Sequence, residues 1–185
     1  MQPLDLDFLK DRYDFELARK DKLTDALNLP IGILTAVGGL LGVMVSGFSY
    51  QIPWLKKIFV TFLTFDSSAF AISLFFLAFA FHRQKYGYLQ FPGEFRDAEK
   101  ALQEYDPPTA AARFEQYVKD SLIEAADMNA KMNNRRHKYL YRARLAILGT
   151  VIFTTALGVP YVYDHVMVAP KVPVVHIDNL DGRGR

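Results

Sequence analysis

Three long apolar stretches constrain the fold of this chain more than any motif does. Residues 29–48 and 145–163 contain no charged residue, and residues 58–81 contain one ionisable side chain, Asp66. The hydrocarbon core of a bilayer is about 30 Å thick, so a helix of roughly 20 apolar residues can span it. Backbone amides in hydrocarbon must be paired within the segment, so helices are expected rather than open strands. The sequence therefore predicts an all-α membrane protein with three transmembrane helices.

Charged residues gather outside these stretches, although they make up 23% of the chain, as in many soluble domains. The length of 185 residues leaves room for one membrane domain with a helical extension. The chain contains no cysteine, which excludes disulfides, thiolate metal sites and thiol nucleophiles. The first 28 residues are too rich in charge for a cleavable signal peptide, so we expect the first span to remain in the mature chain.

Basic residues near the spans predict the orientation, because Lys and Arg are enriched in cytoplasmic loops. Residues 82–144 contain twelve of the 22 basic residues, and the N-terminal segment adds five. Both segments lie on one side if the first two spans form a hairpin, although Lys56 and Lys57 then lie opposite. We expect a cytoplasmic N-terminus and an external C-terminus. The resulting segments are a cytoplasmic amphipathic helix (1–28), a two-span hairpin (29–81), a cytoplasmic helical domain (82–144), a third transmembrane helix (145–163) and an external tail (164–185).

Helical periodicity continues through the charged segments. Residues 4–28 alternate apolar and charged side chains at helical spacing, which predicts an amphipathic helix, and a short charged helix is expected over 94–105. From residue 110 no proline or glycine occurs until Gly149. We therefore predict one long helical stalk that continues into the third span and extends roughly 50 Å beyond the membrane. Its apolar stripe needs neighbours, either the other cytoplasmic helices or further copies of the chain.

Small residues recur along the first span, and two interpretations of them are open. Glycines four residues apart allow helices to approach closely. This face would pack against another span of the same chain, or copies of this helix would surround a central conduit with the hydroxyl groups as its polar lining. The residues concerned are Thr35, Gly38, Gly39, Gly42 and Ser46.

Asp66 also has two interpretations. An ionisable group within a span is costly and is a functional candidate for that reason. Alternatively, Asp66 and the two serines after it cap a helix N-terminus, so that residues 53–65 form a separate interfacial helix. In the third span, threonine hydroxyls are expected to bond to carbonyls of the preceding turn. These threonines are Thr150, Thr154 and Thr155.

A basic and aromatic band precedes the third span. Guanidinium groups interleaved with aromatic rings would hold phosphates and stack on bases, and a ring of several copies would multiply this charge. The alternative is that these residues are anchors that reach anionic lipid headgroups. The band consists of Arg135, Arg136, Lys138, Tyr139, Arg142 and Arg144.

No catalytic, metal-binding or cofactor-binding pattern occurs in the sequence. The four histidines lack ligand spacing, and neither a nucleophile elbow nor a phosphate loop is present. We therefore expect no enzyme activity, no metal and no cofactor.

The segment YDFELARKDKLT at residues 13–24, followed by NLPIGILT at residues 28–35 and the glycine-rich span, resembles the SLATT-type effectors of bacterial anti-phage operons. The shared layout is an amphipathic helix, a two-span hairpin and a long cytoplasmic helix, and it covers roughly residues 10–135. This chain differs in its third span and its outer tail. The resemblance implies a pore in the bacterial inner membrane that permeabilises an infected cell.

The combined expectation is a homo-oligomeric channel gated from the cytoplasm by a nucleotide or a short oligonucleotide. Three spans are too few to enclose a conduit within one chain, so several copies are required, and we expect a tetramer. The partners would be the lipid bilayer, other copies of the chain, the nucleotide ligand and a cytoplasmic enzyme that makes it. The alternative is a non-conducting membrane adaptor that docks a cytoplasmic protein.

Overall fold

The computed structural model describes residues 5–82 and 85–168, and within these ranges the chain contains helices and no strand. Three helical segments are long and apolar enough to cross a membrane. The prediction of an all-α protein with three potential spans is therefore confirmed. The helices are α1 (Leu6–Asp25), α2 (Asn28–Gly47), α3 (Pro53–Phe81), α4 (Pro92–Tyr105) and α5 (Ala110–Val168).

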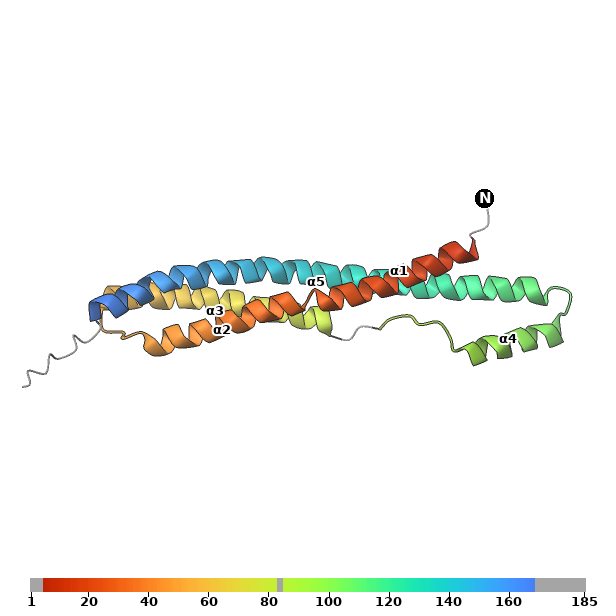
Figure 1. Cartoon of the computed structure of the whole chain (residues 1–185), viewed down its shortest axis with the longest axis horizontal. Coiled ribbons are helices and arrows are strands. Elements are labelled where there is room, and N and C mark those ends of the chain that lie inside the picture. Colours follow the sequence, from red (N-terminus) through yellow and green to blue (C-terminus); the bar gives the residue numbers. More distant parts are fainter. Residues whose placement is uncertain (1–4, 83–84, 169–185) are drawn as a thin grey trace, which may run out of the picture.

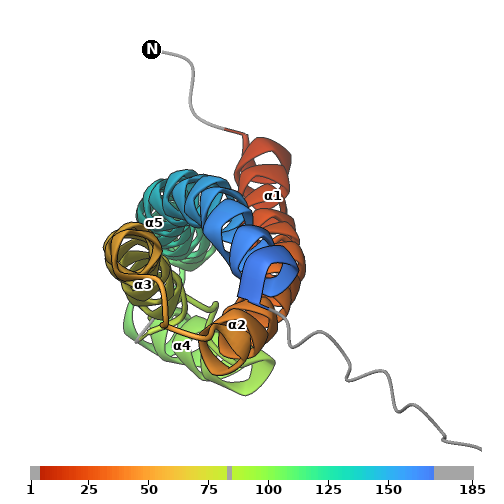
Figure 2. The same ribbon diagram turned by 90° about the vertical axis from the view of Figure 1, so that its left-hand side faces the viewer.

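The molecule is a long, narrow bundle, and α5 runs along almost all of it (Figure 1). Helices α1 and α2 follow one another along one side of α5, and α3 lies along another side of its C-terminal part (Figures 1 and 2). Helix α4 packs beside the N-terminal part of α5. The turn between α2 and α3 meets the C-terminal part of α5 at one end of the bundle, which we call the hairpin end.

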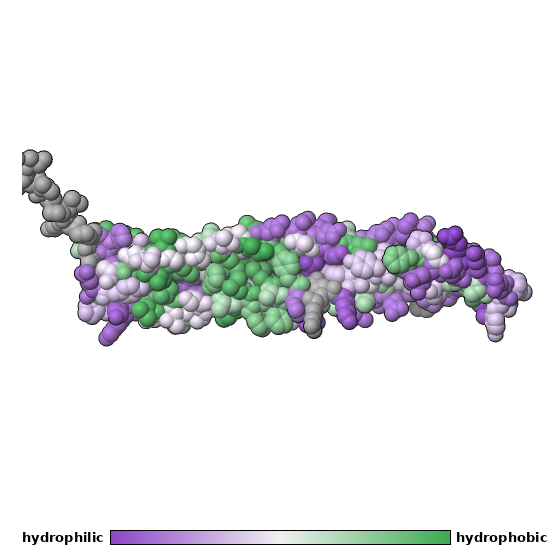
Figure 3. Space-filling view, turned by 90° about the horizontal axis from the view of Figure 1, so that it is seen from below, coloured by the Kyte–Doolittle hydropathy of each residue, from purple (hydrophilic) through white to green (hydrophobic). Residues whose placement is uncertain are grey.

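Hydropathy divides the bundle into two parts along its length. The apolar half comprises α2, α3 and residues 145–168, whereas the charged half comprises α1, residues 85–105 and residues 110–144. On the face drawn in Figure 3, hydrophobic residues gather over the first part and hydrophilic residues over the second. Large apolar side chains on the outside of the apolar half, such as Phe75 and Ile152, are more than half exposed. This surface suits contact with lipid chains.

Helix α5 is continuous for 59 residues, about 90 Å at the usual rise per residue. The predicted unbroken helix from residue 110 into the third apolar stretch is therefore present. It continues beyond the expected end at residue 163 as far as Val168 and contains Pro160. Because proline has no amide hydrogen, the carbonyl of Ala156 lacks its usual donor four residues later.

Helix α3 is also continuous, from Pro53 to Phe81. The alternative in which Asp66 caps a second helix, with residues 53–65 separate, is therefore wrong. Asp66 instead lies in the middle of α3 and is fully buried. A capping sequence is used only where the backbone ahead of it is not helical, and here the apolar residues on both sides of Asp66 pack along α5 as one helix.

Three hydrophobic clusters hold the helices against α5. One joins α1 to α5 in the charged half, around Tyr13 and Leu122. A second lies where the two halves meet and includes Leu27, Leu77 and Ala143. The third is at the hairpin end and contains the stacked rings of Phe48 and Phe59, whose centroids lie 4.0 Å apart. Contacts that run the length of the bundle therefore fix α1, α2 and α3 against the same helix.

The extended segment after α3 is held to α5 by a close backbone approach at Gly87. The amide of Gly87 donates to Asn129 Oδ1 at 2.8 Å, and Asn129 Nδ2 donates back to the Gly87 carbonyl at 3.0 Å. A Cβ on Gly87 would lie 2.9 Å from the Cα of Ala125. Only glycine therefore fits here without moving α5 or breaking the paired hydrogen bonds.

We predict that Gly87→Ala loosens this segment and lowers stability by about 1–3 kcal/mol, because the added methyl group collides with the backbone of α5. Thermal unfolding of the purified protein and limited proteolysis between α3 and α4 would measure the change. Gly93→Ala is the matched control, since a Cβ there meets nothing within 4 Å. Equal melting temperatures and cleavage rates for the two variants would contradict the proposed close approach.

Candidate functional site

Arg136 is the centre of a buried polar network at the level where the charged half meets the apolar half. Its side chain is 6% exposed, so its guanidinium is not on the ligand-binding face that the sequence predicted. It instead donates to groups on three segments of the chain, which connects α1, α3 and the extended segment to α5. The acceptors are the Lys20 carbonyl (3.2 Å), Thr24 Oγ1 (3.1 Å), the Ala80 carbonyl (3.3 Å) and Tyr86 Oη (3.0 Å).

The same network continues along α5 to a buried carboxylate. Tyr86 Oη donates to Asn133 Oδ1 at 3.1 Å, and Asn133 Nδ2 donates to Glu16 Oε2 at 3.0 Å. Glu16 is fully buried and forms ion pairs with Arg12 at 3.0 Å and Arg19 at 3.5 Å. A buried charge of this kind is tolerated when it is paired and hydrogen-bonded. Glu16 and Asn133 therefore hold α1 in one register on α5.

Lys20 closes the network on its exposed side. Its ammonium donates to Tyr88 Oη at 3.0 Å and lies 5.1 Å from the centre of the Tyr86 ring. The hydrogen bond to Tyr88 raises the pKa of Lys20 above its ordinary value. The charged form therefore contributes to the attachment of α1 to the extended segment.

A second polar cluster lies inside the apolar half, between α3 and α5. Thr154 Oγ1 donates to Asp66 Oδ2 at 2.9 Å, and Ser73 Oγ lies 3.5 Å from Thr150 Oγ1. All four side chains are buried, and the other carboxylate oxygen of Asp66 has no hydrogen-bond partner in the described chain. Because these polar groups are buried, their hydrogen bonds fix the register of α3 on α5.

The threonines of α5 also bond to its own backbone, as predicted. Thr150, Thr154 and Thr155 donate to the carbonyls four residues earlier at 3.0, 2.9 and 2.8 Å. Only the first two lie against α3, whereas Thr155 is exposed. The sequence therefore predicted the hydrogen bonds to the preceding turn correctly. It did not predict that Thr150 and Thr154 face α3 while Thr155 is exposed.

At the hairpin end, Asp164 joins the last turns of α5 to the connection between α2 and α3. Its carboxylate accepts from the Ser49 amide at 2.7 Å and from Ser49 Oγ at 2.6 Å, and it is 2% exposed. The neighbouring Tyr50 has a backbone φ of 58°, a value that is uncommon for a residue with a side chain. This connection is therefore closed by a specific contact rather than left as a free loop.

The small residues of α2 lie mostly on an open face. A Cβ on Gly39 or Gly42 would meet nothing within 4 Å, whereas one on Gly38 would touch the Phe70 ring at 3.4 Å. Thr35 and Ser46 are exposed, and their hydroxyls donate to carbonyls of α2 itself. The interpretation that this face packs within the chain therefore holds for Gly38 and is wrong for Gly39 and Gly42.

The remaining basic residues of the band lie on the outside of α5. Arg135, Lys138, Arg142 and Arg144 are exposed, and Tyr139 is half-buried. The guanidinium of Arg135 lies 5.8 Å from the centre of the Tyr139 ring, and that of Arg142 lies 5.9 Å from the Phe76 ring. Arg135, Lys138, Tyr139 and Arg142 therefore share one side of α5. Arg144 lies on the opposite side of the helix, and Arg136 points inward.

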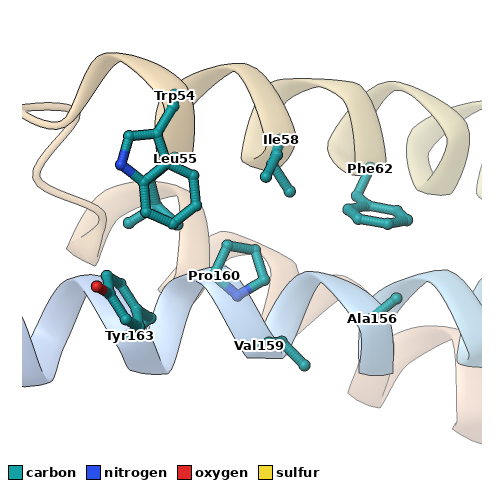
Figure 4. A pocket seen from close by; sticks show the side chains of 8 residues that line it. All are labelled: Trp54, Leu55, Ile58, Phe62, Ala156, Val159, Pro160 and Tyr163. Atoms are coloured by element: carbon teal, nitrogen blue, oxygen red, sulfur yellow. The ribbon is translucent and has the colours of Figure 1, made fainter.

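Two apolar grooves lie between helices of the apolar half. One lies between α3 and α5 at the hairpin end, has a volume of about 320 Å³, and is closed at one end by the Trp54 and Tyr163 rings (Figure 4). The other lies between α2 and α5, has a volume of about 290 Å³, and has Arg144 among its lining residues. Among residues 5–82 and 85–168, no cluster of three His, Cys, Asp or Glu side chains has the arrangement of a metal site.

Comparison of the chain with protein-family models, with curated proteins and with solved structures gave no match. The class of protein is therefore set by the fold alone: a helical protein with three segments suited to crossing a membrane.

We predict that Thr154→Val destabilises the protein by about 1–3 kcal/mol, because it removes the hydrogen-bond donor from a buried carboxyl group. Thr155→Val is the matched control, since that hydroxyl bonds only to its own helix and is exposed. Thermal unfolding of both variants in the same detergent would measure the difference. A loss of stability as large in Thr155→Val as in Thr154→Val would refute a specific role for the Asp66 contact.

Proposed function

We propose that the protein is a homo-oligomeric membrane channel, in which several copies, most simply four, associate through the open face of α2. The single observation that carries this proposal is that Gly39 and Gly42 have no neighbour within the chain. Small residues on a membrane helix allow close approach of another helix. Three apolar helices in one chain do not leave space for a conduit, so a conducting path would lie between copies.

The hydroxyls of Thr35 and Ser46 are on the same face as the glycines, seven and four residues from Gly42. In a ring of copies they would give the path a polar lining. Helix α3 also exposes hydroxyls, those of Thr64 and Ser68. It is a poorer candidate for that lining because its outer surface is rich in phenylalanine and lacks the glycines that allow close approach.

We further propose that the charged half lies in the cytoplasm and that a polyanion regulates the channel there. Arg135, Lys138 and Arg142 are exposed on the part of α5 that leads directly into its apolar part. A nucleotide or short oligonucleotide would contact these residues, and it would shift the channel only if it binds the open and closed rings with different affinity. The resemblance to anti-phage effectors supports a role in bacterial defence at the inner membrane, with a signal-producing enzyme as partner.

The second candidate is a membrane adaptor that docks a cytoplasmic protein. The observation that favours it is the exposure of aromatic side chains around α4, where Phe91 and Tyr105 are 78% and 84% exposed. An adaptor would bind its partner through this surface and would conduct no ions.

The assembly is tested by Gly39→Leu with Gly42→Leu. We expect the double variant to fold, because both added side chains enter open space in the single chain. We expect it to form smaller assemblies than the parent and to conduct fewer ions in liposomes. Gly149→Leu is the matched control, since a Cβ on this glycine of α5 also meets nothing within 4 Å. A double variant that keeps the size and flux of the parent would exclude this face from the assembly, and a parent that conducts nothing would favour the adaptor.

The gate is tested by replacing Arg135, Lys138 and Arg142 with glutamine. In this triple variant, membrane insertion and oligomer size should be unchanged, whereas the response of ion flux to an added polyanion should fall. In the parent, binding of the polyanion should weaken steeply with salt, because binding releases counterions. Lys131→Gln is the control, because Lys131 is exposed on α5 outside the band. An unchanged response in the triple variant would assign these residues to membrane anchoring alone.

A further inference from the structure

The groove between α2 and α5 has two features that do not occur together in the other apolar groove. Its walls are apolar along about one turn of α2 and two turns of α5, and a cation lies among its lining residues. The residues that line it include Leu29, Ile33, Arg144, Ile147, Leu148 and Val151. The groove between α3 and α5 at the hairpin end is lined by apolar and aromatic residues and contains no cation (Figure 4).

The position of Arg144 places this groove at the surface of the membrane. Arg144 is the last charged residue of α5 before residues 145–163, which contain no charge. Val151 lies seven residues further along, about 10 Å into the apolar half. Leu148 is 57% exposed, so the groove is open to the surrounding lipid rather than closed by another helix of the chain.

The guanidinium of Arg144 is available to a ligand. In the described part of the chain no ion pair, hydrogen bond or aromatic ring contact involves it, whereas Arg136 is bound by backbone and side-chain acceptors, and Arg135 and Arg142 each lie near an aromatic ring. Tyr141, one turn earlier on the same side of the helix, is 58% exposed. Its hydroxyl would be at headgroup level, where tyrosine is favoured.

The Arg144 guanidinium and the apolar groove suit a molecule that has both a phosphate group and a hydrocarbon chain. A guanidinium binds a phosphate through two parallel hydrogen bonds, and an apolar groove of about 290 Å³ suits a hydrocarbon chain. A soluble phosphate compound would satisfy Arg144 but gain nothing from the groove walls. The positive charge of Arg144 favours a headgroup with net negative charge over a zwitterionic one.

We propose that the α2–α5 groove is a binding site for an anionic phospholipid, with the phosphate on Arg144 and one acyl chain along Leu29, Ile33, Leu148 and Val151. The site lies on one copy of the chain and depends neither on conduction nor on assembly. A lipid there would join α2 to α5 at the level where these two helices enter the membrane.

The test uses native mass spectrometry of the full-length protein, titrated in detergent with phosphatidylglycerol or with phosphatidylcholine of the same chains. We expect preferential retention of phosphatidylglycerol by the parent. Arg144→Gln should weaken that binding roughly five- to tenfold, the size expected for one basic residue at a lipid headgroup. Lys131→Gln, on the same helix but outside the groove, should bind as the parent does. Equal affinities of the Arg144→Gln variant and the parent would overturn the proposal.

The acyl-chain part of the site is tested by filling the groove. Leu148→Trp should reduce binding of phosphatidylglycerol, whereas Ile152→Trp should not, because Ile152 is 58% exposed on the next turn and does not line the groove. Equal binding of phosphatidylglycerol by the two tryptophan variants would show that the acyl chain does not enter the groove. Circular dichroism and oligomer size would verify that each variant is folded.

An excess of inorganic phosphate separates a lipid site from a phosphate site. Phosphatidylglycerol bound through both its headgroup and its chain should remain bound in excess phosphate. Displacement of the lipid by phosphate alone would identify Arg144 as a site for soluble phosphate compounds and would overturn the proposal.

Discussion

The continuity of α5 is the constraint on which the rest of this structure depends. Every other helix of the described chain packs on it, and it passes from the charged half into the apolar half without a break. Backbone groups in hydrocarbon must be paired within their own helix. The continuous helix α5 meets this requirement except at Pro160, which leaves the Ala156 carbonyl without its usual donor. The side chains of α5 therefore change from largely charged to apolar along its length, while its backbone stays helical.

Two buried polar clusters fix the other helices on α5 in different surroundings. In the charged half, Asn133 and Arg136 reach backbone and side-chain acceptors on α1, α3 and the extended segment. In the apolar half, Thr154 reaches a single carboxyl group, that of the buried Asp66. Both clusters specify register, because a shift of either partner helix would leave a buried polar group without a partner. The exposed basic band lies between the two clusters, where a bound anion would act on a helix that contacts all the others.

Two surfaces of the apolar half have no partner within the described part of the single chain. The face of α2 that carries Gly39 and Gly42 has no neighbour, and Arg144 lies at the mouth of an apolar groove. We propose that another copy of the chain packs on the first surface and that an anionic phospholipid binds at the second. These two surfaces lie on different sides of the apolar half, so another copy of the chain and a lipid would occupy separate places.

The sequence by itself determined the helices, because uncharged runs of about 20 residues and a helical apolar period have few other solutions. It also predicted the continuity of α5 and the local hydrogen bonds of Thr150, Thr154 and Thr155. Only the tertiary structure decided which polar residues face inward. Arg136 and Arg135 are adjacent and chemically identical, yet one is buried by α1 and α3 and the other is exposed. Asp66 looks like a helix cap in sequence and becomes a buried contact because α3 packs on α5 as one helix. Whether a polar side chain is buried or exposed depends here on contacts with residues distant in the chain, and these contacts cannot be predicted from the local sequence pattern.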